Sequence, residues 1–197
     1  PGHRPRARAG QGDTPMTRLH LSFGAVALGA CLSVPGQPFL PPGTVNPATV
    51  DAGSDAWPAV VFDSNGIAHA VWSSHSNYVG GAGADFDLYY SSSAGGAWSP
   101  PVLVNTNAQL DTGDDEWPRL AIAPDGSLHC VWQSNDSFAG SGNDYDIMYS
   151  RRVGGSWSSV QLVNSWATTD NGQVPVPADD QLPGIAVGLD GRVVVAW

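Results

Sequence analysis

The sequence predicts an all-β protein made of repeated four-stranded antiparallel units, and three observations lead to this fold class. The dipeptide Val-Asn recurs at residues 45–46, 104–105 and 163–164, with a constant spacing of 59 residues. The 24 glycines and 16 prolines are typical of a chain rich in turns. In each unit a short apolar run ends in tryptophan, at Trp72, Trp132 and Trp197. A fixed period of this length is typical of stacked units that bury their apolar faces against one another.

The first unit begins with a predicted hairpin. Residues 59–62 form a short apolar strand, residues 63–66 (Asp-Ser-Asn-Gly) suit a tight turn, and residues 67–73 form the second strand. Both faces of this second strand carry apolar side chains, which indicates an inner strand that is covered on two sides. One face holds Ala68, Ala70 and Trp72, and the other holds Ile67, His69 and Val71.

Two further strands complete the unit. A long connection, residues 74–85, leads to a third strand at 86–92, and a Gly-Gly turn leads to a fourth strand at 98–104. Pro100 and Pro101 fit only an outer edge strand, because proline cannot donate a hydrogen bond to a neighbouring strand. Four antiparallel strands with an apolar inner pair and a proline-tolerant outer strand describe a blade of a β-propeller.

The second unit repeats this order, and the third repeats its beginning. The strands expected in them are 120–123, 127–133, 145–151 and 157–163 in the second unit, and 185–187 and 192–197 in the third. A propeller closes with 4 to 8 blades. We therefore interpret the chain as about two and a half blades, a fragment of a six-bladed ring, in which residues 43–46 would pair with the last blade.

The N-terminal region is predicted to contain a targeting signal. Residues 16–31 contain an apolar run too short to span a bilayer, and their ending Leu-Gly-Ala-Cys resembles the lipobox of a bacterial lipoprotein signal peptide. This resemblance implies lipidation of Cys31 and a place in the bacterial cell envelope, on the outer surface or in the periplasm. An ordinary cleaved signal, and hence secretion, is the alternative. We expect residues 1–15 to be unstructured upstream sequence, 32–43 a Pro/Gly-rich tether, and 44–197 the partial propeller, with repeats starting at 46, 105 and 164.

The charge of the chain argues against two classes of partner, and its cysteine content argues against a disulfide-rich fold. The net charge is −10, and from residue 32 onward four arginines face 17 acidic residues, which gives −13. Such a surface repels nucleic acid and anionic membranes, so we expect membrane contact through the lipid alone. Only two cysteines exist, Cys31 and Cys130. We expect no disulfide framework and a small buried core role for Cys130.

Residues 43–197 resemble the sialidase-like propeller with BNR, or Asp-box, repeats. Such a box has the pattern Ser-x-Asp-x-Gly-x-x-Trp, and Ser, Gly and Trp are in register at residues 91–98 and 150–157, whereas the Asp is replaced in both. The family resemblance implies three arginines around a substrate carboxylate, with a Tyr/Glu nucleophile pair and an Asp acid. Those motifs are not matched here, so we assign no catalytic residue. Arg119, after Trp117-Pro118, matches by position only.

Loop residues are the candidates for ligand binding. Two aromatic residues, Tyr78 and Phe138, lie in Gly-rich stretches with Asn77 and Asn135 nearby. A ring with amides on an exposed loop can hold a sugar through its apolar face and its hydroxyl groups. Together with Arg119 they form the predicted ligand-binding set. The alternative for each ring is packing under its own loop.

Acidic residues recur in two patterns. Asp51-x-Gly-x-Asp55 and Asp111-x-Gly-x-Asp115 place oxygen ligands around a glycine turn, as Ca²⁺ requires, although hydrogen-bonded turns are the alternative. The pairs Asp85/Asp87 and Asp144/Asp146 each share one strand face, and their repetition favours a structural role. His69 and His129 are expected to pack, because Val194 takes their place in the third unit.

These observations predict a non-catalytic, envelope-anchored propeller that binds a glycan or an extracellular protein through loops on one face. No cofactor is expected apart from possible Ca²⁺. One alternative is an exo-acting glycoside hydrolase of the sialidase type, whose catalytic residues lie mostly in missing C-terminal blades. The other is a structural surface repeat protein.

Overall fold

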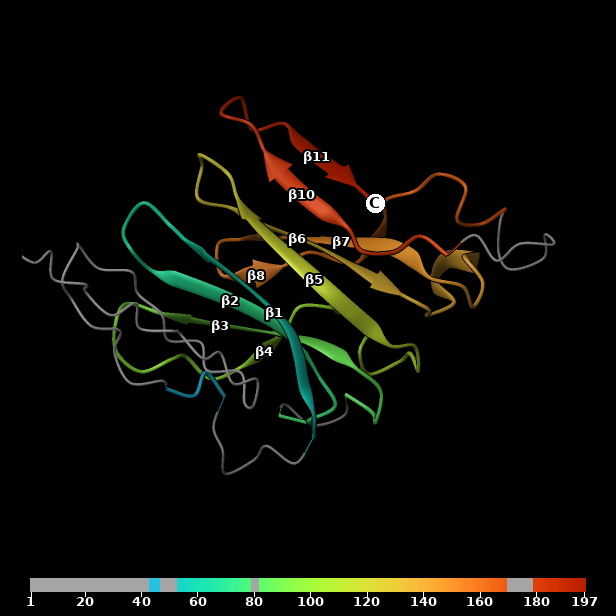
Figure 1. The fold of residues 1–197 in the computed structure, drawn as a ribbon, viewed down its shortest axis with the longest axis horizontal. Helices are drawn as coiled ribbons and strands as arrows, with labels where there is room; N and C mark the ends of the chain where they lie inside the picture. The colour runs from blue at the N-terminus through green and yellow to red at the C-terminus, as the bar shows by residue number, and fades with distance from the viewer. Residues whose placement is uncertain (1–42, 47–52, 79–81, 170–178) are drawn as a thin grey trace, which may run out of the picture.

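The computed structural model describes residues 43–46, 53–78, 82–169 and 179–197 (Figure 1). The described residues form strands and one short 3₁₀ turn, Phe138–Gly140. Among them there is no helix long and apolar enough to cross a membrane. The predicted signal peptide, the tether up to residue 42, Cys31 and Asp51 lie outside the described residues.

The first blade is a four-stranded antiparallel sheet in chain order. It comprises β1 (Asp55–Phe62), β2 (Ala68–Ser74), β3 (Asp87–Ser93) and β4 (Val102–Leu103). The hairpin turn between β1 and β2 closes at Gly66, whose φ of +79° only glycine adopts readily. The four predicted strands and their order are confirmed.

The second blade follows the same plan, and a third hairpin lies beside it. The strands are β5 (Asp115–Ile122), β6 (Leu128–Ser134), β7 (Asp146–Val153), β8 (Ser156–Trp157) and β9 (Gln161–Leu162), followed by the hairpin of β10 (Gly184–Val187) and β11 (Val193–Ala196). β8 and β9 both pair with β7 and so share the place of a fourth strand.

The fourth strands are shorter than the sequence predicts. Proline at 100–101 interrupts the ladder in the first blade, and serine side chains replace part of the pairing in both blades. Ser91 Oγ donates to the carbonyl oxygen of Ser99 at 2.7 Å, and Ser150 Oγ donates to that of Ser158 at 2.9 Å. The two blades therefore hold their outer edges by the same side-chain bonds.

The first strands of successive units lie next to one another. β1 packs beside β5, and β5 packs beside β10, while the other strands of each blade extend away from them (Figure 1). Repeated antiparallel sheets arranged with their first strands innermost form the architecture of a β-propeller. The predicted fold class is confirmed, whereas the number of blades in a closed ring stays a prediction.

The main core lies between the two blades. One face of β2 and β3 packs against one face of β6 and β7, and the opposite face of β2 packs in a second cluster with Tyr89 and Val45, which confirms that the second strand is covered on both sides. The buried members of the main core are Val71, Leu88, Tyr90, Val104, Leu120, Leu128, Cys130, Trp132, Met148 and Val160. Cys130 is a free, fully buried core residue, as predicted, and burial raises the pKa of its thiol.

The recurring Asn of the Val-Asn dipeptide ties one blade to the next. Asn105 Nδ2 donates to Asp87 Oδ1 at 2.8 Å in β3 and to Asp115 Oδ2 in β5, while its Oδ1 accepts from Leu88 N at 3.1 Å. Trp132 Nε1 donates to the other oxygen of Asp115 at 2.7 Å. Every polar atom of the buried Asn105 side chain is therefore used.

The same link recurs at the other junctions. Asn164 Nδ2 donates to Asp146 Oδ1 at 2.9 Å and to Asp180 Oδ2 at 2.6 Å. Asn46 Nδ2 donates to Asp55 Oδ2, which corresponds to the bond between Asn105 and Asp115. The period therefore has a physical basis, because the amide of each copy bonds to an aspartate of the following unit, and Asn105 and Asn164 also bond to an aspartate of the preceding third strand.

Candidate functional site

The innermost strands start earlier than the sequence predicts and contain a bulge. The pairing of β1 with β2 is irregular between Ala56 and Ala59, and that of β5 with β6 between Glu116 and Arg119. The bulges hold Trp57 (φ +49°) and Trp117 (φ +51°), and Leu182 (φ +56°) takes the same position in the third unit. In each copy a proline directly follows the residue with positive φ. Because polar residues precede it, the sequence pattern of this segment is typical of a loop.

The two bulges bring aromatic side chains together. The rings of Trp57 and Trp117 are stacked, with centroids 5.4 Å apart and planes 24° apart. Phe86, just before β3, lies 5.2 Å from Trp57 and 3.6 Å from the ring of the exposed His75. We call these four residues the aromatic face. The rings of Trp57, Trp117 and Phe86 are half-buried and His75 is exposed, so part of each ring remains open to solvent.

The backbone conformation at the bulges costs energy. A bulky residue with positive φ is strained by about 1–3 kcal/mol, and such strain persists only where the surrounding structure enforces it. Bulges also redirect a side chain away from its place in the strand alternation. The repeated bulge therefore turns Trp57 and Trp117 towards each other across the boundary between two blades.

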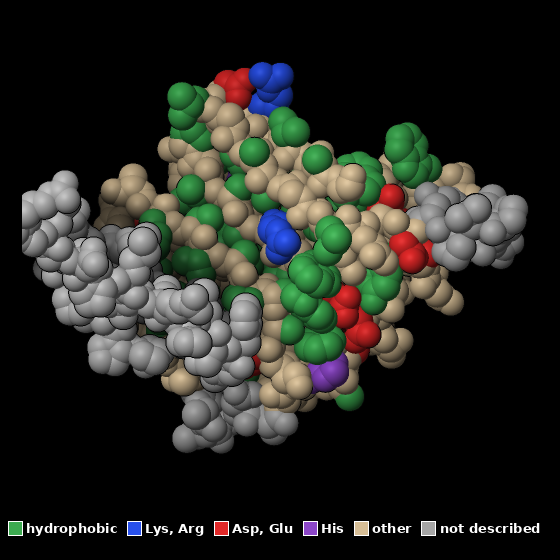
Figure 2. Space-filling model, viewed as in Figure 1, with side chains coloured by type: hydrophobic (Ala, Val, Ile, Leu, Met, Phe, Trp, Pro, Cys, Tyr) green, Lys and Arg blue, Asp and Glu red, His purple; other side chains and the backbone are tan. Residues whose placement is uncertain are grey.

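Charged groups border the aromatic face. Arg119 Cζ lies 5.9 Å from the ring centroid of Trp117, and its Nη1 donates to the carbonyl oxygen of Pro118 at 3.0 Å. Glu116 Oε2 accepts from Gln133 Nε2 at 3.3 Å, and burial raises the pKa of Glu116. Figure 2 shows hydrophobic and acidic side chains gathered where β1 and β5 start side by side.

The structure also shows what the predicted loop residues contact. The Tyr78 ring packs edge-on against Tyr89 at 4.9 Å, and its hydroxyl donates to Asp55 Oδ1 at 3.1 Å and accepts from Asn46 Nδ2 at 2.7 Å. Burial raises the pKa of Tyr78. Phe138 packs against the main core. Both rings thus make the contacts that the alternative of packing under the loop describes.

The predicted amides make backbone contacts. Asn135 Oδ1 accepts from Asp114 N at 2.7 Å, and Asn77 Oδ1 accepts from Ala82 N at 3.4 Å. Arg119 joins the aromatic face through Trp117. Trp57 and Trp117 were not among the predicted binding residues, because their repetition suggested blade construction alone. Proline directly after each Trp, at the start of an inner strand, was the signal that could have revealed the bulge.

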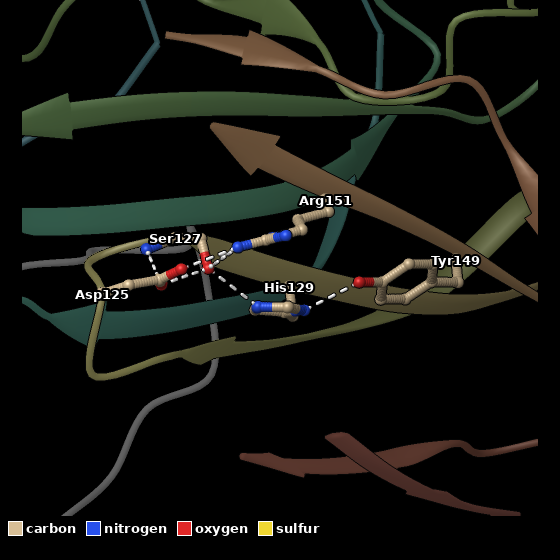
Figure 3. Close-up of polar contacts among 5 residues, drawn as sticks. All are labelled: Asp125, Ser127, His129, Tyr149 and Arg151. Carbon is tan, nitrogen blue, oxygen red and sulfur yellow. Dashed lines mark hydrogen bonds and ion pairs between the residues drawn. The ribbon is translucent and has the colours of Figure 1, made fainter. Parts of the chain in front are cut away.

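A second polar group lies at the opposite end of the β5–β6 hairpin, beside a cleft of about 490 Å³ next to β10 and β11 (Figure 3). Ser127 Oγ donates to Asp125 Oδ1 at 2.6 Å and accepts from Arg151 Nη2 at 3.0 Å. Its remaining lone pair faces His129 Nε2 at 3.0 Å, and His129 Nδ1 lies 2.7 Å from the hydroxyl of Tyr149. Arg151 also pairs with Asp125 at 2.7 Å.

This group resembles a Ser/His nucleophile pair but has the wrong proton arrangement. Because the single proton of Ser127 goes to Asp125, His129 Nε2 donates to Ser127 and cannot act as its base. Burial, followed by the Arg151 charge, lowers the pKa of His129 and keeps it neutral. His69 repeats the bond to a tyrosine, Tyr90, at 2.7 Å. Both histidines make packing contacts in this arrangement.

The two adjacent arginines of β7 serve different neighbours. Arg151 pairs with Asp125, whereas Arg152 Cζ lies over the ring of Tyr90 at 4.5 Å. The alternation of a strand sends successive side chains to opposite faces. The two guanidinium groups therefore cannot meet at one ligand.

Three carboxylates come together at the junction between the blades. One oxygen from each of Asp85, Asp87 and Asp111 lies within 4.8 Å of the others. Asp111 was a predicted metal ligand, whereas Asp115 is engaged by Asn105 and Asp55 by Asn46 and Tyr78. The predicted sharing of a face by Asp85 and Asp87 is confirmed.

The glycine of the Asp-x-Gly-x-Asp pattern has its own role. A Cβ atom on Gly113 would lie 2.4 Å from Asp136 N, and one on Gly53 would lie 2.7 Å from the carbonyl carbon of His75. Any larger residue would therefore push apart two backbone segments that cross closely. This glycine recurs because of a close backbone approach, independently of a metal.

Comparisons with known proteins concern the fold. An endo-arabinase from Bacteroides thetaiotaomicron is similar with 15% identity and a TM-score of 0.49, over 82% of this chain and 57% of that one. A Hadza microbial sialidase is similar with 13% identity and a TM-score of 0.44, over 58% and 27%. The chain thus spans just over half and about a quarter of their lengths. No family model and no curated protein matches the sequence. The Asp-box assignment and lipidation stay predictions.

Proposed function

We propose that this protein is a carbohydrate-binding β-propeller module whose ligand lies on the aromatic face. The observation that carries the proposal is the stacked pair of Trp57 and Trp117, presented by two strained bulges at the boundary of two blades. The two tryptophans come from equivalent positions of adjacent blades, so they form a continuous platform. Phe86 extends this platform on the side of β3.

The chemistry of a sugar matches such a surface. A pyranose ring presents apolar C–H faces and a hydroxyl edge, so rings cover the faces and polar groups bind the edge. Glu116 can accept hydrogen bonds from hydroxyl groups, and Arg119 and His75 can donate them. The carboxylates of Glu116, Asp114 and Asp179 all interact electrostatically with Tyr145, so these three acidic groups lie near one another. The polar border of the aromatic face is therefore acidic. We therefore favour neutral or basic sugars over anionic ones.

The proposal is tested by binding to a glycan array that contains neutral, amino and sialylated oligosaccharides, followed by calorimetry with the strongest binder. Trp117→Ala should weaken binding about 10- to 30-fold, because a buried tryptophan anchor contributes about 1.4–2 kcal/mol or more. Trp166→Ala is the matched control, since Trp166 is 58% exposed and lies outside the platform. Equal affinity in both variants and the wild type, or an array without any signal, would rule out the aromatic face as the site.

A glycoside hydrolase is the second candidate, and Glu116 is the observation that favours it. Burial raises the pKa of this carboxyl group, which is what a general acid requires at neutral pH. Hydrolysis also needs a second carboxyl group across the glycosidic bond. Release of 4-nitrophenol from a panel of nitrophenyl glycosides, lost in Glu116→Gln while sugar binding is kept, would establish catalysis. Binding without release supports the non-catalytic module.

Envelope anchoring belongs to the same proposal. We propose that Cys31 carries a lipid and holds the propeller at the bacterial cell envelope, with its ligand outside the membrane. Metabolic labelling with an alkyne fatty acid should mark the wild-type protein and not Cys31→Ser. A wild-type protein that takes up no label, or processing that resists a lipoprotein signal peptidase inhibitor, would instead indicate an ordinary secreted protein, and a label that persists in the variant would mean that Cys31 is not the lipidated residue.

A further inference from the structure

Asp85, Asp87 and Asp111, which we call the acidic cluster, lie at the junction between the two blades. Asp85 and Asp87 stand on either side of Phe86 at the start of β3, and Asp111 comes from the connection that leads to β5. One oxygen of each lies within 4.8 Å of the others. Asn105, which bonds to both Asp87 and Asp115, fixes the cluster to both blades.

Several oxygen atoms in this place receive no hydrogen bond from the described residues. Asp85 Oδ2 and Asp111 Oδ1 are buried atoms without a donor, and so is Oδ1 of Asn107, whose amide nitrogen bonds to Asp111. Asp87 is 1% exposed, and its Oδ1 accepts from Asn105. A buried carboxylate oxygen without a donor is costly, because it has lost its water and gained nothing in return.

No side-chain cation balances these charges among the described residues. The ion pairs that the described residues form lie away from the acidic cluster, and they are His69–Asp63, Arg151–Asp125 and Arg192–Asp190. Asp136 adds a further negative charge beside Asn107. Like charges in a buried place favour either protonation or a bound cation.

The second blade provides an independent observation. Asp144, the counterpart of Asp85 in the next repeat, is only 7% exposed, and neither of its carboxylate oxygens has a hydrogen-bond partner. Asn164 bonds to Asp146 there as Asn105 bonds to Asp87. A buried carboxylate oxygen without a donor thus recurs at the same place in the blade, whereas the other buried aspartates among the described residues each accept from an asparagine amide.

We propose that the acidic cluster is a Ca²⁺ site that joins the two blades, with Asp85, Asp87 and Asp111 as ligands and Asn107 Oδ1 as a further oxygen donor. All four donors are oxygen atoms, which selects a hard cation over zinc or copper. Ca²⁺ accepts irregular shells of 6 to 8 oxygens with water among them, whereas Mg²⁺ demands near-ideal octahedral geometry. Ligands that come from two separate chain segments seldom form an ideal octahedron, so they suit Ca²⁺ better than Mg²⁺.

The site is tested on the whole chain after chelation, with Tb³⁺ luminescence as a probe that Trp57 and Trp117 can sensitise, and with calorimetry for Ca²⁺ itself. Asp111→Asn and Asp85→Asn should each weaken Ca²⁺ binding at least 10-fold. Asp125→Asn, which changes a carboxylate at the far hairpin end, should leave it unchanged. If the second blade holds its own ion, the wild type binds two ions, and Asp144→Asn removes one of them.

Thermal unfolding separates loss of the ion from loss of the fold. Without metal, Asp111→Asn should melt at or above the wild-type temperature, because it removes charge repulsion. With Ca²⁺ the wild type should gain several degrees more than the variant, and more than with Mg²⁺. Absence of Ca²⁺ binding to the wild type, equal binding by Asp111→Asn, or a metal-free variant that melts well below the wild type would each overturn the site.

Discussion

At the scale of single residues, the recurring polar side chains are explained by what they bond to. The sequence marks Asn105, Asp115 and Asp87 by repetition, but it cannot show that one amide joins the two carboxylates, because these residues are 10 and 18 positions away in the chain. The same limit applies to the three aspartates of the acidic cluster. Asp111 was predicted from a local pattern, whereas Asp85 and Asp87 reach it only through the packing of two blades.

Replacing Asn105 tests the link between blades. Asn105→Ala removes two donors and one acceptor from a fully buried place and leaves Asp87 and Asp115 less well paired. We expect the free energy of unfolding to fall by about 2–4 kcal/mol in a urea titration. Asn65→Ala, in the exposed turn after β1, is the matched control and should change it by less than about 0.5 kcal/mol. Similar values for the two variants would contradict the role of the link.

His129 makes stability depend on pH. Burial, followed by the Arg151 charge, lowers its pKa in the folded state, so the unfolded chain takes up the proton first as pH falls. This contribution to stability is complete above the ordinary histidine pKa of about 6.5 and is lost as pH falls below it. Between pH 7.5 and 5.5 the wild type should therefore lose more free energy of unfolding than His129→Val. A variant with the same pH slope would show that other groups determine it.

At the scale of elements, periodicity predicted the strands well and their ends poorly. The second and third strands of each blade fall within two residues of the expected bounds, because both their faces are apolar and their turns contain glycine. The starts of β1 and β5 were missed, since Trp-Pro after polar residues is typical of a loop. The fourth strands were overestimated where Pro100 and the serine contacts replace the ladder.

The bulge predicts an unusual order of stability at Trp117. Glycine normally weakens a strand, but at φ +51° it adopts the backbone without the strain that any Cβ brings. Trp117→Gly should therefore be more stable than Trp117→Ala by about 1 kcal/mol in urea unfolding. At Trp98, where φ is not positive, the alanine variant should be equal or better. If alanine is also better at position 117, the left-handed conformation carries no strain.

At the scale of the whole molecule, the repeat encodes the propeller redundantly, whereas a binding face depends on a few residues. The fold class could be predicted because each unit carries the same strands, turns and core positions. The aromatic face could not, because it forms across a boundary between two units and depends on two left-handed tryptophans. Repetition, which identified the blades, also made those tryptophans look purely structural.

The acidic cluster and the aromatic face meet at one segment, and this predicts coupling between ion and sugar. Phe86 packs against Trp57, while its neighbours Asp85 and Asp87 point into the cluster, as strand alternation requires. A cation that holds both carboxylates fixes the position of Phe86. Ca²⁺ should therefore strengthen binding of the array-selected sugar about 5-fold or more, within the usual range of coupling between sites.

Linkage makes this coupling testable from both sides. The sugar must raise the affinity for Ca²⁺ by the same factor as Ca²⁺ raises the affinity for the sugar. Calorimetry with each ligand, in the presence and absence of the other, measures both factors. Asp111→Asn should remove the coupling but keep the sugar affinity of the metal-free wild type, since Asp111 is outside the platform. Two intact affinities without coupling would mean that the sites are independent and that Phe86 is held by Trp57 and His75 alone.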